Sequence, residues 1–447
     1  MKQIQLFILF FISYGLYAQL NIENINLNEY KLTEYKYKSL GLYFNFEGNG
    51  DVVSKNDFIR ESNVGDFNNK LRLKSKFVAI KNSRKKQLSR YVSLNVNPGL
   101  HTKYVDEHSE INDFNFSNYL TYRQDVRYYL NSLIFFENGM NFLLSWDKTI
   151  KDSPEIESSF SSNYLRIPLY IGFGRVENVT SAWHAFRIIK DLRQNDLLIS
   201  NSNLDKDEIM KMADYIAIRK NTRVFDSRRK MQDDLIGLSN NFLKSIVDIS
   251  DPHVYASLYD MWQYGINDIR RSGTTLSFGI EPGFRYFSRY DKPNSNNDFD
   301  HKTIDLLAMV RFEYYRALSM NWQLDFGISL AGGFEDIIGI NSDEEPRANS
   351  LLRSNLNIGV GYYPTSRTSF KSTLRVGAGI RGDSNGYRGN TNFNFNFNNN
   401  LYYYISPQLR LSLYLSMDNY TTIYSDDEYG YLHMTATYGL SFNYYIF

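Results

Sequence analysis

The sequence predicts a membrane-spanning, all-β fold: an antiparallel up-and-down β-barrel of about 14 strands, with 12 or 16 as alternatives, interrupted by a small α-helical insert. Three features predict it: the composition, a period-two alternation of apolar residues, and the pattern of connector lengths. Of the 447 residues, 16% are aromatic, yet the mean hydropathy is −0.44. Strands with one apolar and one wet face combine these properties, because only every second residue is apolar.

The alternation covers two regions, 36–174 and 273–447. In Phe370–Ile380 the even positions are apolar with one exception, and the odd positions are polar or Gly. Such alternation is the signature of a strand with one wet face. Fourteen segments are each long enough to cross a membrane as a tilted strand; they lie near 38–48, 68–80, 90–104, 113–128, 134–147, 162–174, 274–290, 301–315, 320–334, 351–363, 368–382, 391–405, 408–420 and 431–447.

Connector lengths distinguish a membrane barrel from a soluble sandwich, which would alternate as well. Short and long connectors take turns along the chain, and membrane barrels have short periplasmic turns and longer external loops. The short connectors are near 82–87, 130–132, 317–320, 364–368 and 406–408, and the long ones around 48–68, 148–161, 292–300, 335–349 and 418–430.

Tyrosines cluster where strands enter the short turns. A row of aromatic residues at one level is expected at a membrane boundary. The predicted periplasmic girdle comprises Tyr128, Tyr129, Tyr314, Tyr315, Tyr362, Tyr363, Tyr402, Tyr403, Tyr444 and Tyr445.

Residues 1–18 are expected to form a signal peptide. Lys2 precedes an apolar core that is too short to span a bilayer comfortably, and Ala18 suits the cleavage position. The exported chain then divides into 19–174 with strands 1–6, an insert at 175–270, and 271–447 with strands 7–14.

The insert changes period from two to that of a helix. Apolar residues recur at helical spacing after Ala182, after a capping box at Asp205–Glu208, from Met231, and after Asp251-Pro252. Three or four helices are expected to pack into a small bundle. Because the insert follows an even number of strands, we expect it to be periplasmic or to fold into the lumen as a plug.

Two stretches resemble known outer-membrane proteins. The aromatic end of the chain, with its terminal Phe447, resembles the C-terminal signal of Gram-negative outer-membrane proteins that the barrel-assembly machinery recognises, although Phe447 stands in phase with Asn443 and not with the apolar set. The opening of the insert, G-R-V-E-N-V-T-S-A-W-H-A-F-R-I-I-K-D-L, is similar to a stretch of uncharacterised Bacteroidota outer-membrane proteins in which helices interrupt a barrel. The resemblance implies a cell outer-membrane location, with membrane lipid, lipopolysaccharide and the barrel-assembly machinery as partners. It implies no activity.

Composition argues against several kinds of chemistry. The absence of Cys rules out disulfides, thiolate zinc sites and cysteine nucleophiles. The six His residues are scattered, and no signature joins a nucleophile to a base. The net charge of +1 points to no nucleic acid. We therefore expect no enzyme and no catalytic, cofactor or metal site.

The strand register predicts a set of charged side chains that face the lumen, with more bases than acids. Rings of charge tune ion selectivity in pores, whereas internal ion pairs would stabilise a filled barrel. The sequence is compatible with both interpretations, a selective pore and a filled barrel. The set is Arg123, Arg127, Arg166, Glu281, Arg285, Asp305, Arg311, Glu313, Asp325, Arg353, Lys371, Arg375 and Arg410.

These features favour a passive or gated channel for small hydrophilic solutes, with the insert docking or gating from the periplasmic side. The alternative is a non-conducting structural, assembly- or secretion-associated protein that binds a periplasmic partner through residues 175–270.

Overall fold

The computed structural model describes residues 26–444, except 33, 58–59, 106–108, 153–154, 200–204, 221–226, 265–268, 293–297, 340–346, 384–389, 407–408 and 425–430. The expected signal peptide, Tyr445 and Phe447 lie outside this range.

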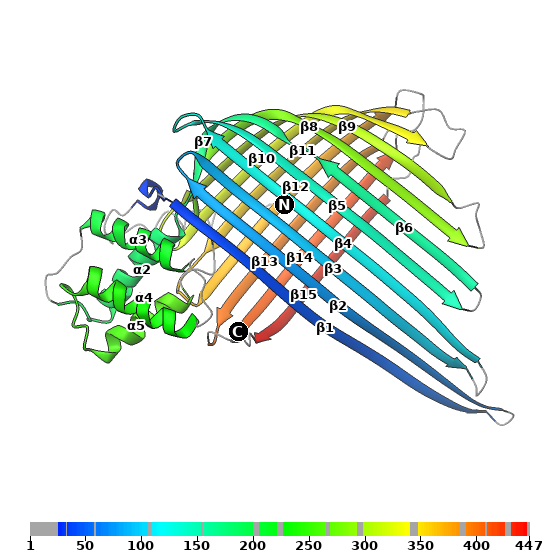
Figure 1. The fold of residues 1–447 in the computed structure, drawn as a ribbon, viewed down its shortest axis with the longest axis horizontal. Helices are drawn as coiled ribbons and strands as arrows, with labels where there is room; N and C mark the ends of the chain where they lie inside the picture. Colours follow the sequence, from blue (N-terminus) through cyan, green and yellow to red (C-terminus); the bar gives the residue numbers. More distant parts are fainter. Residues whose placement is uncertain are drawn as a thin grey trace, which may run out of the picture.

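A single antiparallel sheet of 15 strands forms most of the molecule and curls into a barrel (Figure 1). Each strand pairs with the next along the chain, except that β6 and β7 do not pair with each other and both pair with β5 and β8. The strands are β1 Glu34–Asp57, β2 Arg60–Ser83, β3 Lys86–Val105, β4 Ser109–Tyr129, β5 Ile134–Asp152, β6 Glu155–Arg166, β7 Leu169–Asn178, β8 Arg271–Lys292, β9 Phe299–Ala317, β10 Trp322–Gly339, β11 Arg347–Tyr362, β12 Thr368–Asp383, β13 Asn390–Tyr404, β14 Leu409–Tyr424 and β15 Tyr431–Tyr444. The predicted fold class, an up-and-down barrel with inserted helices, is confirmed.

Strands β6 and β7 are two halves of one barrel strand. Both pair with β5 and β8 in one continuous register, and the break falls at Ile167-Pro168. Proline lacks the N–H that a ladder needs. Its carbonyl still accepts a hydrogen bond from Gly139 N–H at 2.8 Å. Counted as one strand, β6 and β7 bring the barrel to the 14 strands expected.

Several strands run further than the sequence predicts. β1 and β2 pair through residues 48–57 and 60–68, where a long connector was expected, and β5 and β6 pair through most of 148–161. The expectation of long connectors there is wrong, because these segments are polar at consecutive positions. Alternation identifies a strand only where its two faces meet different surroundings.

Helices occupy the chain between β7 and β8 and lie together beyond the end of the barrel where the short turns are (Figure 1). They are α2 Thr180–Gln194, α3 Lys206–Lys220, α4 Ser227–Leu238 with the π-helical turn η3 Ser239–Leu243, and α5 Pro252–Tyr264. The capping box forms, since Glu208 Oε2 accepts from Asp205 N–H at 3.3 Å. β7 continues to Asn178, so the helical part begins later than residue 175.

The helices share one core with the chain before β1. Leu27, Tyr30 and Leu32, around the short helix η1 (Leu27–Glu29), are buried with the apolar stripes of α2, α3 and α5. We call α2–α5, η3 and residues 26–32 the cap. No helix in the described parts of the chain is long and apolar enough to cross a membrane.

Candidate functional site

The candidate site is the inner face of the barrel together with the cap that adjoins it. Cross-strand partners share a face of a sheet. The register therefore shows which residues of each strand lie on the inner face of the barrel and which lie on the outer face. Arg311, which contacts Glu137 across the interior, stands opposite Ser329, which stands opposite Asn355. The same row continues through Gly377, Asn394, Tyr420 and His433 on β12 to β15.

The outer face carries large exposed apolar side chains. They recur at every second position and include Leu40, Leu42, Phe44 and Phe46 on β1, Ile304 and Leu306 on β9, Phe334 on β10, and Tyr438, Leu440 and Phe442 on β15. Soluble monomers rarely expose contiguous apolar patches larger than a few hundred Å². The barrel is thus apolar outside and polar inside.

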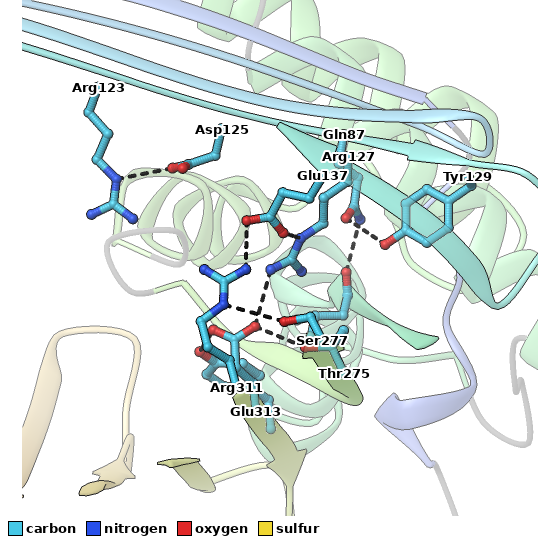
Figure 2. Close-up of polar contacts among 12 residues, drawn as sticks. Gln87, Arg123, Asp125, Arg127, Tyr129, Glu137, Thr275, Ser277, Arg311 and Glu313 are labelled. Carbon is cyan, nitrogen blue, oxygen red and sulfur yellow. Dashed lines mark hydrogen bonds and ion pairs between the residues drawn. The ribbon is translucent and has the colours of Figure 1, made fainter. Parts of the chain in front are cut away.

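Six of the predicted lumen charges form two neighbouring groups of ion pairs, which Tyr170 links: its O–H donates to Glu281, and the Arg311 guanidinium lies over its ring. Figure 2 shows the group around Arg127, Arg311 and Glu313. Arg127 on β4 contacts Glu313 on β9 at 3.3 Å, although β5, β7 and β8 lie between these strands. Arg166 lies 2.8 Å from Asp305 and 3.4 Å from Glu281. Two walls of the barrel are therefore joined across its interior.

Glu137 on β5 is the centre of the group in Figure 2. Its carboxylate is 2.5 Å from the Arg127 guanidinium and 2.7 Å from that of Arg311, and its side chain is only 2% exposed. Thr275 and Ser277 on β8 complete the cluster by hydrogen bonds to Glu313 and Arg311. Glu137 is not among the predicted lumen charges, although the alternation of β5 places it in phase with inward residues. We call Arg127, Glu137, Arg166, Glu281, Asp305, Arg311 and Glu313 the ion network.

The remaining predicted lumen charges are not part of the ion network. Arg123 pairs with Asp125 on its own strand at 3.0 Å and remains exposed (Figure 2). The guanidinium of Arg285 lies over the Tyr164 ring, and Asp325 accepts from Gln323. Arg353, Lys371, Arg375 and Arg410 share the inner face of β11, β12 and β14 by register. The interior thus has one side that holds the ion network and another, on β11, β12 and β14, that carries these four basic residues outside the network.

The predicted Tyr girdle is divided between the two faces, because neighbouring residues in a strand point to opposite sides. By register Tyr128, Tyr314, Tyr362 and Tyr403 lie on the outer face. Tyr129, Tyr315, Tyr363 and Tyr402 lie on the inner face; for example, Tyr129 donates to Gln87 and Tyr363 packs against Trp183. Tyr444 ends β15, and its side chain lies outside the described set.

The cap is attached to the short turns by two buried arginines. Arg187 on α2 donates to Asn321 Oδ1 at 2.9 Å and to the carbonyls of Tyr363 and Pro364 at 2.7 and 3.0 Å. Arg270 donates to the carbonyls of Ser319, Met320 and Trp322 at 2.5 to 2.8 Å. Both bind turn carbonyls, and burial lowers the pKa of each to about 10.

Trp183 on α2 lies beside both arginines, whose guanidinium carbons are 4.8 and 5.6 Å from its ring centroid. Its indole N–H donates to the Met320 carbonyl at 2.5 Å. We call Trp183, Arg187 and Arg270 the Arg–Trp cluster. A second contact joins Asp260 on α5 to Arg367 in the β11–β12 turn. None of these residues is among the predicted site residues. A signal for two of them was that Trp183 and Arg187 lie in the stretch at the opening of the insert that resembles other outer-membrane proteins.

Comparisons with known proteins assign the chain to no family. No family model matches it, and no curated protein matches it. Among solved structures, it is similar to the translocator domain of the autotransporter NalP from Neisseria meningitidis, with 7% sequence identity and a TM-score of 0.29 over 80% of this chain and 88% of that one. The function proposed below therefore depends on this chain's own residues.

Proposed function

We propose that this protein is an outer-membrane channel for small hydrophilic solutes, gated at its periplasmic end by the cap. The single observation that carries the proposal is the opposite polarity of the two faces of one sheet. An apolar outer face suits lipid, and a polar inner face suits water and polar solutes.

The position of the cap supports the gate. The cap contacts the turns β9–β10 and β11–β12 through the Arg–Trp cluster and the Asp260–Arg367 pair. It also contacts the β13–β14 side, where the rings of Tyr264 and Tyr404 are 5.7 Å apart. A body attached to turns from several strands can open or close the passage beneath it as one unit.

The test is single-channel conductance in planar bilayers, with native protein compared to Arg187→Gln and Arg187→Gln/Arg270→Gln. We expect the native protein to conduct rarely, and the double variant to be open at least tenfold more of the time. The matched control is Arg193→Gln, an exposed arginine on the same helix, which should behave as native. If all four proteins are folded in the bilayer and none conducts, the channel proposal is wrong and the scaffold alternative replaces it.

A further inference from the structure

The inner face of β11–β15 differs in chemistry from the ion network. Five Asn residues at alternate positions of β13 lie on the inner face, namely Asn392, Asn394, Asn396, Asn398 and Asn400. The register places Asn355 and Asn357 of β11 on the same inner face. We call this surface the Asn wall. It is built on paired strands, so its side chains are held at regular spacing.

A pocket of about 570 Å³ lies on the Asn wall. This volume falls in the range of small-molecule sites, about 300–1,000 Å³. Its lining contains one acid, one Arg and one His, Asp418, Arg375 and His433, and several neutral amides. A ligand with several formal charges would find few opposite charges there.

Gly377 lies between Asn355 and Asn394, two residues that line the pocket. A Cβ at this position would lie 2.1 Å from Asn394 Oδ1 and 2.9 Å from Asn355 Oδ1. The glycine therefore allows amides from β11 and β13 to converge over β12. Both Asn355 and Asn394 are exposed to the interior, so their polar atoms can reach a solute.

Other polar groups are already ordered by hydrogen bonds. Asn396 donates to Asp418, which also accepts from Ser416 at 3.0 Å, and Tyr420 O–H donates to Asn392 at 3.1 Å. Tyr414 and Tyr420 lie on the same face by register with Asn400 and Asn394. Both Tyr side chains are exposed, at 42% and 45%.

We infer that the Asn wall binds neutral oligosaccharides, an inference that rests on the proposed channel and names its solute class. A sugar hydroxyl donates and accepts hydrogen bonds, and an Asn amide offers both functions without charge. The apolar C–H face of a sugar ring can lie on a Tyr ring, whose O–H remains available for a polar contact. Polyols of this kind need many neutral partners and few ions, which is what the lining of the pocket supplies.

The test is isothermal titration calorimetry on the folded full chain in detergent. The probes are maltohexaose, mannohexaose and chitohexaose as neutral hexamers, with hyaluronan hexasaccharide and chitosan hexamer as charged counterparts. We expect at least one neutral hexamer to bind at least tenfold more tightly than both charged ones. Absence of binding by all three neutral hexamers, or equal binding of a charged one, would overturn the inference.

Variants locate the site. Gly377→Leu, which fills the pocket, and Asn355→Ala/Asn394→Ala should each weaken binding of the neutral hexamer at least tenfold. Asn95→Ala, on the inner face of β3 by register, is the matched control and should bind as native. Equal loss in Asn95→Ala would overturn the location. Retention of the heat-modifiable gel shift shows that each variant is folded.

Conductance separates this inference from the proposed function. If the protein conducts, but no neutral hexamer blocks its current or none binds in the titrations, the proposed channel stands and the inferred Asn wall site is wrong. If the protein is folded and binds a neutral hexamer in the calorimeter but shows no conductance, the proposed channel is wrong and the inferred site stands.

Discussion

Arg187 and Arg270, 83 positions apart in the chain, stack on the same indole ring: their guanidinium carbons lie 4.8 and 5.6 Å from the Trp183 ring centroid. Each also donates to backbone carbonyls of barrel turns. Two buried cations near one another disfavour each other, and the cost is offset by these carbonyls and by the π-face. The arrangement ties the helices to the barrel at a point where neither could satisfy its polar groups alone.

Removal of Arg187 should loosen the cap without unfolding the barrel. Hydrogen bonds to a charged donor contribute about 1.5–3 kcal/mol, so Arg187→Ala should lower the free energy of local opening of α2 by about 2 kcal/mol. Hydrogen–deuterium exchange of α2 amides measures this directly. The control Arg193→Ala should leave exchange unchanged, and equal acceleration in both variants would contradict an attachment role for Arg187.

Glu137→Gln should destabilise the barrel strongly. The substitution leaves the Arg127 and Arg311 guanidiniums next to a neutral amide in a buried site, and loss of one partner of a buried ion pair costs about 3–5 kcal/mol. Unfolding in urea, followed by tryptophan fluorescence, measures the change. Asp125→Asn is the matched control, because its partner Arg123 is 64% exposed and such pairs contribute about 0–1 kcal/mol. Similar costs for the two variants would show that the ion network contributes nothing beyond an ordinary surface pair.

Closure of the barrel can be tested by cross-linking. Among the described residues, no backbone ladder joins β1 to β15, so both are edge strands of the sheet. Unpaired backbone groups cost several kcal/mol each in hydrocarbon, and we expect the two edges to pair in a membrane. The chain contains no native Cys, so engineered disulfides can be read without background.

The cross-linking experiment pairs Leu42→Cys, on the outer face of β1, with single Cys substitutions along β15 in membrane vesicles under mild oxidation. Because a disulfide needs Cβ atoms about 3.5–4.5 Å apart, we expect a cross-link at one even position between 436 and 442, on the outer face, and none at 437, 439 or 441. Absence of cross-links at every position would contradict closure by these two strands.

The buried phenol of Tyr30 should make the cap less stable at alkaline pH. Burial raises its pKa well above its usual range, with a further increase from the hydrogen bond to Asp214. In the unfolded chain the phenol ionises near pH 10. The stabilising contribution is therefore complete below about pH 10 and is lost as the pH rises above that value.

The measurement compares native protein with Tyr30→Phe by proteolysis of the cap at pH 8 and pH 11. At pH 8 the variant should be less stable by about 1 kcal/mol, since one hydrogen bond is lost. At pH 11 the difference should shrink or change sign. A difference that is the same at both pH values would show that the Tyr30 phenol ionises equally in the folded and unfolded states.

Strand identity was predictable because the two faces of the sheet meet different surroundings. Phe370–Ile380 alternates with one exception and Leu409–Met417 alternates throughout, and both lie within strands, β12 and β14. The same signal fails for residues 48–68, where both faces are polar and pairing nonetheless continues. The inward phase of Arg127, Arg311 and Glu313 was also available from the sequence.

The sequence by itself determined the barrel, the face on which residues of the alternating segments lie and the existence of a helical insert, because these depend on periods of two and 3.6 residues. Tertiary structure decided which inward charges meet. Arg127 reaches Glu313 over 186 positions of chain, and Arg270 reaches the turn at 319–322 while its neighbours enter β8. Local periodicity carries no information on such contacts, since they depend on the curvature of the whole sheet and on where it places the ends of distant strands.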